Sequence, residues 1–215
     1  MPDDQIKRFV EHGVEELPVS PMDPPEAYQP PAAESLTYEQ LVAPLRELWD
    51  EHENYLKVLS VFENAMIALK DNKWKMTPEI SSAFRDYFQF VDEHVTVHNR
   101  KEERGLFPVL RERLIQKGEC SPGEAPVTPA DIMEDEHAKV GQSVAIVFTL
   151  LGLAPRLQDA ASRDQLFEQA FQLGQEIVET MKLHIFRENT ILFPMAQQIL
   201  NEEEWIEIAT KMKRC

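Results

Sequence analysis

One eleven-residue pattern occurs twice in this chain of 215 residues and limits what the chain can form. The pattern is H-x3-E-x3-L-F-P, at residues 98–108 and again at residues 184–194, 86 positions later. A recurrence of this length indicates an internal repeat rather than a chance match. Residues four apart lie on one face of a helix, so each His would point the same way as its Glu. Two such pairs indicate a metal site.

A second, shorter pattern precedes each copy of the first. Asp50-Glu51-His52 recurs as Asp135-Glu136-His137, 85 positions later. The chain therefore reads as two helical hairpins of one design. The first helix of each hairpin carries a histidine, and the second helix carries H-x3-E.

Helix start signals divide the chain after residue 36. Residues suited to N-capping stand at five positions: Thr37, Thr77, Thr128, Ser162 and Asn201. They predict four long helices and a short fifth one, at about 38–71, 78–117, 129–154, 163–199 and 202–213. Each long helix carries an apolar stripe at helical spacing, and no alternating run typical of strands competes. The sequence therefore predicts an all-α fold.

Six polar residues interrupt these apolar stripes, and all six are His or Glu. Antiparallel packing would bring the four histidines to nearly one level, with mismatches of roughly 2–6 Å along the helix axes at 1.5 Å per residue, and both glutamates one turn away. Burying two carboxylates costs several kcal/mol each unless they are compensated, and a metal ion would compensate them. Ligation by N and O without thiolate suits iron, manganese or zinc. The predicted ligands are His52, His98, Glu102, His137, His184 and Glu188.

Plainer interpretations exist for each residue alone. A single His on an apolar face is more often a hydrogen-bonded core residue, and a single H-x3-E pair more often lies on the surface. Six such residues at matched depth in a duplicated pattern favour the metal site. His94, one turn before His98, is a candidate fifth imidazole. Glu103 points about 100° away from Glu102, so we expect it at the surface or behind a ligand.

The first 36 residues differ in composition from the rest. They hold seven of the fifteen prolines and predict an extended arm. We therefore divide the chain into a Pro-rich arm (1–36), a helical domain (37–200) and a short C-terminal helix (201–215).

The net charge and the apolar runs limit the classes of partner that we expect for this chain. The net charge of −16 argues against nucleic acid and against anionic membrane surfaces. The longest apolar run, roughly residues 144–154, is too short to span a bilayer, and no secretory signal is evident. Cys120 and Cys215 do not form a disulfide framework. We expect a cytoplasmic protein.

The two repeated patterns resemble those of the hemerythrin-like superfamily, the HHE cation-binding domains, over roughly residues 37–200. The resemblance implies an up-and-down antiparallel four-helix bundle with a non-haem di-iron centre. Two iron ions, bridged by oxo or hydroxo groups and by carboxylates, would be the cofactor, with Mn or Zn as possible substitutes. The same six residues, His52, His98, Glu102, His137, His184 and Glu188, would be the ligands.

Two departures separate this chain from the oxygen-carrying hemerythrins. Those proteins have a second histidine four residues after the one on the third helix, where this chain has Gly141, and they end with H-x4-D. The chain is more similar to bacterial hemerythrin-like proteins with four His and two Glu. Some of these, the iron-sulfur repair proteins, carry an N-terminal cysteine motif, which nothing before Cys120 matches.

The favoured function is a binding protein that binds or senses O2, NO or iron. A di-iron enzyme acting on hydrogen peroxide, NO or Fe(II), in stress defence or iron-centre repair, would use the same ligands, so the motif does not separate the two. A third hypothesis is a regulatory module that metal stabilises and whose arm contacts a protein partner. A purely structural bundle without metal is the fourth.

Overall fold

The computed structural model describes residues 36–215, and their regular secondary structure is entirely helical. The predicted all-α class is confirmed for this part of the chain. The predicted arm, residues 1–36, lies outside the described residues except for Leu36. The division into residues 1–36, 37–200 and 201–215 therefore stays a prediction.

The first long helix, α1, spans Ala43–Asp71 and not residues 38–71 as predicted. The Thr37–Gln40 capping box forms, but it starts only a short 3-10 turn, η2, at Tyr38–Gln40. A helix continuing from residue 38 would place Pro44 in its interior. The proline has no N–H to donate and its ring would clash with the carbonyl four residues back, so the helix starts afresh at Ala43.

The second helical segment runs from residue 78 to residue 117, as predicted, but it is not a uniform α-helix. It consists of α2 (Pro78–Phe90), the π-helical η3 (Val91–Val95), α3 (Thr96–Lys101), the π-helical η4 (Glu102–Leu106) and α4 (Phe107–Lys117). Thr77 caps its start by accepting a hydrogen bond from the Ile80 amide. Gly118, with φ of 80°, ends it in the left-handed conformation that favours glycine.

The third and fourth segments repeat this design. They comprise α5 (Pro129–Leu153) with the 3-10 turn η5 (Ala154–Arg156), and then α6 (Ala160–Arg187), the π-helical η6 (Glu188–Leu192) and α7 (Phe193–Ile199). The predicted cap at Ser162 is wrong, because α6 begins at Ala160. Asp159 is the N-cap, and its carboxylate accepts hydrogen bonds from both the amide and the hydroxyl of Ser162.

Both Leu-Phe-Pro triplets follow a π-helical turn. Pro108 and Pro194 are the second residues of α4 and α7, directly after η4 and η6. Because proline cannot donate the α-helical hydrogen bond and its ring crowds the preceding turn, a wider turn accommodates it without ending the helix.

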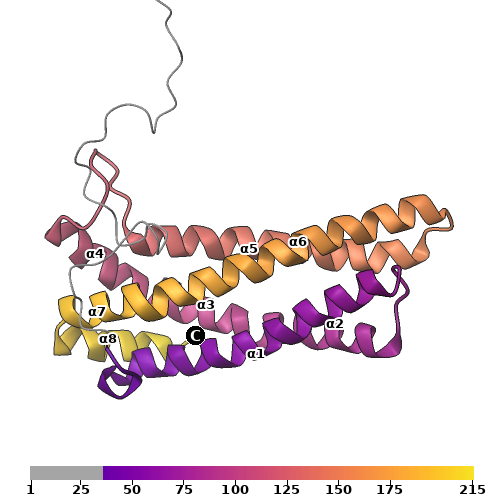
Figure 1. Ribbon diagram of the computed structural model, residues 1–215. Coiled ribbons are helices and arrows are strands. Elements are labelled where there is room, and N and C mark those ends of the chain that lie inside the picture. Colours follow the sequence, from indigo (N-terminus) through magenta and orange to yellow (C-terminus); the bar gives the residue numbers. More distant parts are fainter. Residues whose placement is uncertain (1–35) are drawn as a thin grey trace, which may run out of the picture. The chain divides into compact units, whose positions relative to one another are not determined.

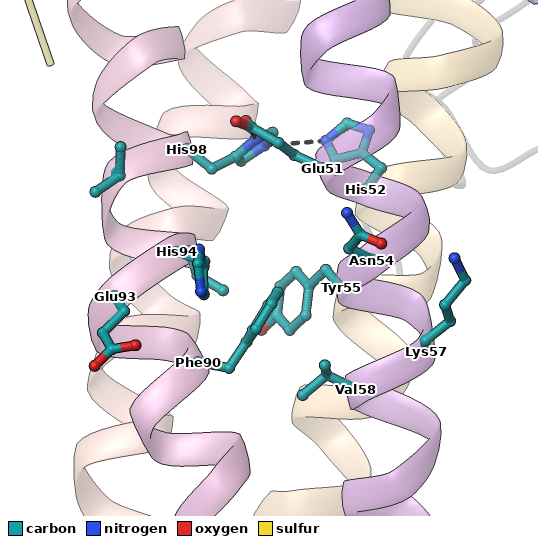
Figure 2. A pocket seen from close by; sticks show the side chains of 12 residues that line it. Glu51, His52, Asn54, Tyr55, Lys57, Val58, Phe90, Glu93, His94 and His98 are labelled. Carbon is teal, nitrogen blue, oxygen red and sulfur yellow. Dashed lines mark hydrogen bonds and ion pairs between the residues drawn. The ribbon is translucent and has the colours of Figure 1, made fainter.

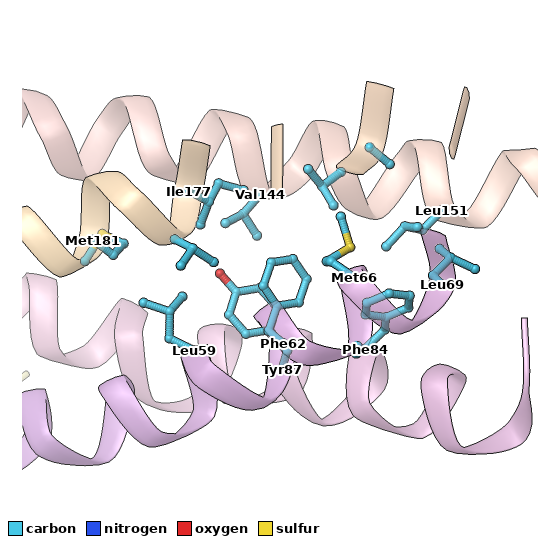
Figure 3. Close-up of a cluster of buried hydrophobic side chains, with 14 of the residues drawn as sticks. Leu59, Phe62, Met66, Leu69, Phe84, Tyr87, Val144, Leu151, Ile177 and Met181 are labelled. Atoms are coloured by element: carbon cyan, nitrogen blue, oxygen red, sulfur yellow. The ribbon is translucent and has the colours of Figure 1, made fainter. Parts of the chain in front are cut away.

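Contacts between segments pair them within and between the hairpins. Helix α1 packs against α2 and against α6, and α5 packs against α6 and α4 (Figure 1). The main apolar core lies beyond His52, along the C-terminal part of α1. There Phe62 stacks on Tyr87 with ring centroids 3.9 Å apart, and Met66 packs beside them (Figure 3). This core holds the two hairpins together on one side of the candidate site.

The short helix α8 (Glu202–Met212) packs against η4, α1 and α3. Asn201 and Glu204 form the predicted capping box at its start. Trp205, Ile208 and Met212 are buried on its inner face. Burial of an apolar side chain contributes about 1.5–3 kcal/mol, so α8 is an integral layer over the π-helical turn that contains Glu102.

One helical stretch, Pro129–Arg156, is long and apolar enough to cross a membrane by length and composition. The prediction that the longest apolar run was too short is wrong in this respect, because the helix extends well beyond residues 144–154. This is weak evidence for a membrane location, since core helices of soluble proteins pass the same test. The inner face of α5 carries His137 and contacts α6.

Candidate metal centre

The structure brings all six predicted ligands together in the interior. Among the described residues, the buried polar or charged side chains are Thr128, which caps α5, and the six predicted ligands, His52, His98, Glu102, His137, His184 and Glu188. Glu102 and Glu188 are 0% exposed. Charged groups are almost never fully buried without partners, so this arrangement needs a compensating charge.

The histidines form two pairs, one from each hairpin. The Nε2 atoms of His52 and His98 are 3.0 Å apart, and those of His137 and His184 are 3.1 Å apart. Two ligands about 2.1 Å from one ion and at right angles to each other would also be about 3.0 Å apart. Each pair is therefore spaced as neighbouring ligands of one cation.

Each glutamate connects the two histidine pairs. Oε2 of Glu102 lies 3.3 Å from His98 Nε2 and 3.4 Å from His137 Nε2. Oε2 of Glu188 lies 3.3 Å from His184 Nε2 and 3.1 Å from His52 Nε2. A carboxylate placed between two imidazole pairs is the arrangement in which helical bundles build dinuclear sites.

The outer ring nitrogens decide which way the histidines present their lone pairs. Nδ1 of His98, His137 and His184 lies 2.8, 3.0 and 2.9 Å from carboxylate oxygens of Glu51, Glu103 and Glu136, respectively. Nδ1 of His52 lies 2.8 Å from Oδ1 of Asn189. Ionised carboxylates only accept hydrogen bonds, so each Nδ1 opposite one donates. The Nε2 lone pairs then face the centre, as in metal-bound histidine.

The phenylalanines of the two Leu-Phe-Pro triplets orient two of the imidazoles. Phe193 is stacked on His52, with an interplanar angle of 5°, and Phe107 is stacked on His137, with an angle of 21°. Each triplet thus contacts the first helix of the other hairpin.

Both glutamates are the first residues of π-helical turns, η4 and η6. A π-helical turn adds a residue to the helical repeat and shifts the direction of the side chains that follow. Turns of this kind occur frequently at functional sites. The π-helical turns that accommodate the prolines therefore also set the backbone direction at Glu102 and Glu188.

The buried carboxylates have no hydrogen-bond partner among the described residues. Their Oε2 atoms reach only the imidazole nitrogens, which attract them when a positive charge is present. Without a metal, protons supply that charge. Burial favours the neutral ring of His98, but Glu102 and Glu51 raise its pKa to about 10. Burial likewise disfavours the ionised form of Glu188, but His184 and His52 lower its pKa to about 2. The donor set is suited to a cation.

These donors fit two metal ions. The potential ligand atoms of His52, His98, Glu102 and Glu188 lie within 4.8 Å of one another, and those of His137, His184 and Glu188 form a second such group. Imidazole and carboxylate without thiolate suit iron, manganese or zinc. The evidence that these residues suit metal ions is the lack of hydrogen-bond partners for Glu102 and Glu188 among the described residues, together with the inward-facing Nε2 lone pairs of the histidines.

His94 lies apart from this cluster. Its side chain is exposed, its ring lies beside Phe90 with centroids 4.9 Å apart, and it lines a pocket of about 420 Å³ (Figure 2). The same pocket is lined by His52 and His98, so it reaches one histidine pair from the surface. The structure therefore places His94 at the approach to the site and not among the clustered donors.

The chain matches the Hemerythrin HHE cation binding domain over residues 43–196. This region is most of the chain and contains all six clustered residues. The chain belongs to this family. Helix α8 lies outside the matched region, although it packs directly on η4.

Curated relatives of the chain are named as iron-sulfur cluster repair proteins. The chain is 26% identical over 120 residues to the iron-sulfur cluster repair protein YtfE of Cronobacter sakazakii, and 25% identical over 120 residues to that of Escherichia coli O81. Each match covers 55% of this chain and 49% of the relative, so the chain spans about half the length of these proteins. No solved structure matches the chain.

Sequence reasoning offered only Glu103 as a group behind a ligand, where the structure has it at His137, and missed the other groups behind the histidines, although the repeats contained the signal. Glu51 and Glu136 are equivalent positions of the shorter repeat, and each accepts from the H-x3-E histidine of its own hairpin. Lys101 and Arg187 are equivalent positions of the longer repeat. They bind Glu51 and Glu136, respectively. The repeated unit is therefore a chain of three groups: a cation, a carboxylate and an imidazole.

Proposed function

We propose that this hemerythrin-family chain holds a non-haem di-iron centre and uses it to bind or sense a small molecule such as O2 or NO, or iron itself. The proposed ligands are the four clustered histidines and two glutamates, with Glu102 and Glu188 shared between the ions. We further propose that the four long helical segments form an up-and-down bundle and that the protein works in the cytoplasm.

One observation supports the proposal above the others. Two fully buried carboxylates have no hydrogen-bond partner within residues 36–215, and each lies 3.1–3.4 Å from the Nε2 atoms of two histidines on different hairpins. A structural bundle without metal would have to keep protonated histidines beside these charges, or else bury the charges at a cost of several kcal/mol each. Bound metal ions remove that cost, and the matching imidazole pairs on both sides favour two ions.

The protein's own residues have defined tasks in this proposal. Glu51, Glu103 and Glu136 hold Nδ1–H of three imidazoles and so present Nε2 to the metals. Phe107 and Phe193 keep two of the rings in place and exclude water from one side. Two iron ions, when bound, would supply redox chemistry and open coordination positions for a small ligand.

Metal loading tests the proposal directly. Metal-free protein, purified without an affinity metal column, is titrated anaerobically with Fe(II) and then exposed to air. We expect two iron ions per chain and a ligand-to-metal charge-transfer absorption. Binding of fewer than one ion per chain, with no such absorption, would contradict the proposal and favour the structural bundle.

The second candidate is an iron-centre repair or peroxide- or NO-consuming enzyme. The observation that favours it is the printed function of the relatives, iron-sulfur cluster repair, at about a quarter identity over half of each chain. Iron-loaded protein would be mixed with NO or hydrogen peroxide in excess. Consumption limited to one ligand per centre supports the binding protein, whereas continued turnover that disappears in Glu188→Ala supports the enzyme.

The regulatory hypothesis concerns residues 1–36, which lie almost wholly outside the described residues. A deletion variant tests this hypothesis separately from the metal centre. Deleting residues 1–36 should leave the iron content and the spectrum intact. If a protein partner is lost at the same time, the arm has a separate binding role.

A further inference from the structure

The two halves of the candidate centre are related position by position, with one difference in charge. In the longer repeat, Glu103 and Asn189 are equivalent positions, each directly after a buried glutamate. Glu103 binds Nδ1 of His137, and Asn189 binds Nδ1 of His52. One half therefore has a carboxylate where the other has a neutral amide.

The remaining surroundings of the two halves match. Glu51 and Glu136 back His98 and His184, and each is itself bound by a cation, Lys101 or Arg187. Burial also matches: His52 and His98 are 1% and 7% exposed, and His184 and His137 are 1% and 6% exposed. Among the groups that hydrogen-bond to the outer ring nitrogens, Glu103 and Asn189 are therefore the one difference in charge between the two halves.

This difference changes how strongly each histidine pair attracts a cation. A carboxylate behind an imidazole makes the ring a stronger donor and adds negative charge near the ion, whereas an amide only orients the ring. The pair His137 and His184 is backed by two carboxylates. The pair His52 and His98 is backed by one carboxylate and one amide.

The weaker half is also the one that borders the pocket. The pocket of about 420 Å³ between α1 and the segment around η3 is lined by His52, His98 and His94 (Figure 2). Tyr55 and Phe90 form part of its wall, and the exposed residue Glu93 also lines it. An ion held by His52 and His98 would thus have a path to solvent.

We propose that the two metal positions are not equivalent: the ion held by His137 and His184 is retained, and the ion held by His52 and His98 is exchangeable through the pocket. Glu103 and Asn189 are positioning residues that set this difference. The inference rests on the proposed di-metal function and deepens it. It assigns the exchange of iron to one half of the centre.

Chelator challenge of the iron-loaded protein tests the inference. Protein loaded anaerobically with two equivalents of Fe(II) is mixed with excess of a coloured Fe(II) chelator, and release is followed by absorbance. We expect two phases of equal amplitude, one ion each. His52→Ala should remove the fast phase, and His137→Ala should remove the slow one.

Variants at the asymmetric position give the decisive comparison. Loss of a group behind a metal-bound histidine typically weakens metal binding 10–100-fold, so Glu103→Gln should speed the slow phase by about tenfold or more. Asn189→Asp should slow the fast phase and bring the two rates together. Glu53→Gln, an exposed residue next to His52, is the matched control and should leave both phases unchanged.

The outcomes separate this inference from the proposed function. If two ions bind but leave in one phase, or if Glu103→Gln leaves both rates unchanged, the inference is wrong while the di-metal centre stands. If iron does not bind at all, the proposed function itself fails. Circular dichroism of each variant shows whether altered release reflects loss of the fold, and a variant that unfolds is replaced by Glu103→Asn.

Discussion

Glu102 and Glu188 are buried carboxylates that have no hydrogen-bond partner among the described residues. Each is fully buried, and each reaches only imidazole nitrogens. The hydrogen bonds around the site are directed to the outer ring nitrogens and not to these carboxylates. At the scale of single residues, the site is therefore built to orient histidines and to leave two carboxylates for a cation.

Glu102→Gln should cut the metal content from two ions per chain to one or fewer. The substitution keeps the size of the side chain but removes the negative charge that is shared between His98 and His137. Elemental analysis after loading and gel filtration measures the content. Glu53→Gln serves as control and should retain two ions. Retention of two ions by Glu102→Gln would show that this carboxylate is not a ligand.

The stability of the metal-free protein should depend on pH in a defined direction. The pKa of His98 is raised from 6.5 to about 10 in the folded state, so its stabilisation is fully present below pH 6.5 and is lost as pH rises toward 10. The pKa of Glu188 is lowered from 4.5 to about 2, so its stabilisation is present above pH 4.5 and is lost as pH falls toward 2.

Urea unfolding of protein kept free of metal by chelator checks this dependence. We expect the free energy of unfolding to be higher at about pH 6 than at about pH 9, by several kcal/mol at most, since one pKa unit corresponds to about 1.4 kcal/mol. Equal stability at the two pH values, or higher stability at the alkaline one, would contradict the assignment of a protonated His98.

At the scale of elements, the π-helical turns are the feature that positions the site. The turns η4 and η6 begin at the buried glutamates and end before the phenylalanines that stack on His137 and His52. Helix α8 covers η4 closely at Gly105. A Cβ at that position would lie 2.9 Å from Cγ of Met212.

Gly105→Ala and Gly141→Ala should shift stability in opposite directions. At Gly105 the added methyl group meets Met212 on α8, and overpacking of this kind costs about 1–3 kcal/mol. At Gly141, which is exposed on α5, nothing lies within 4 Å of the added Cβ, so the gain in helix propensity should stabilise by up to about 1 kcal/mol. Thermal unfolding of both variants measures the two shifts.

A further substitution, Met212→Ala, provides the control for Gly105→Ala. In a Met212→Ala background, Gly105→Ala should cost less stability than it does in the parent protein, because the atom that the new methyl group meets is gone. If Gly105→Ala is as stable as the parent protein, α8 does not press on η4 as the structure shows.

At the scale of the whole molecule, the candidate centre joins the two hairpins. Glu102 contacts His137 of the second hairpin, and Glu188 contacts His52 of the first. Asn189 and Phe193 also reach back to His52. Metal bound by both hairpins would therefore stabilise the association of the two hairpins as well as the site.

Removal of metal should lower the melting temperature of the protein. A ligand present at 100 times its Kd stabilises the folded state by about 2.7 kcal/mol. In a domain of this size, about 1 kcal/mol corresponds to about 2–4 °C, so chelation should lower Tm by about 5 °C or more. Differential scanning calorimetry with and without chelator measures the shift. Glu102→Gln, which should hold little metal, is expected to show a much smaller change.

Much of this architecture was predictable because it is periodic. Apolar stripes and capping residues located the long helical segments, and the duplicated patterns identified the six residues that the fold buries together. The predicted starts of two helices were wrong because a second local signal was present. Helix α1 begins only at Ala43, next to Pro44, and Asp159 rather than Ser162 caps α6. The π-helical turns were not predicted. Pro108 and Pro194 indicate that the helical hydrogen bonding is interrupted, but the sequence does not show whether the helix ends, bends or widens there.

The sequence alone determined the helical class, the internal duplication and the six inward-facing His and Glu residues, since these follow from spacing along a helix. Only the tertiary structure decided how the two hairpins combine. It paired Glu103 with His137 and Asn189 with His52 across the hairpins, and it placed α8 over η4. These contacts depend on the packing of segments far apart in the chain, which spacing within one helix does not encode. The contrast between Glu103 and Asn189 behind the histidines therefore became visible only in the folded protein.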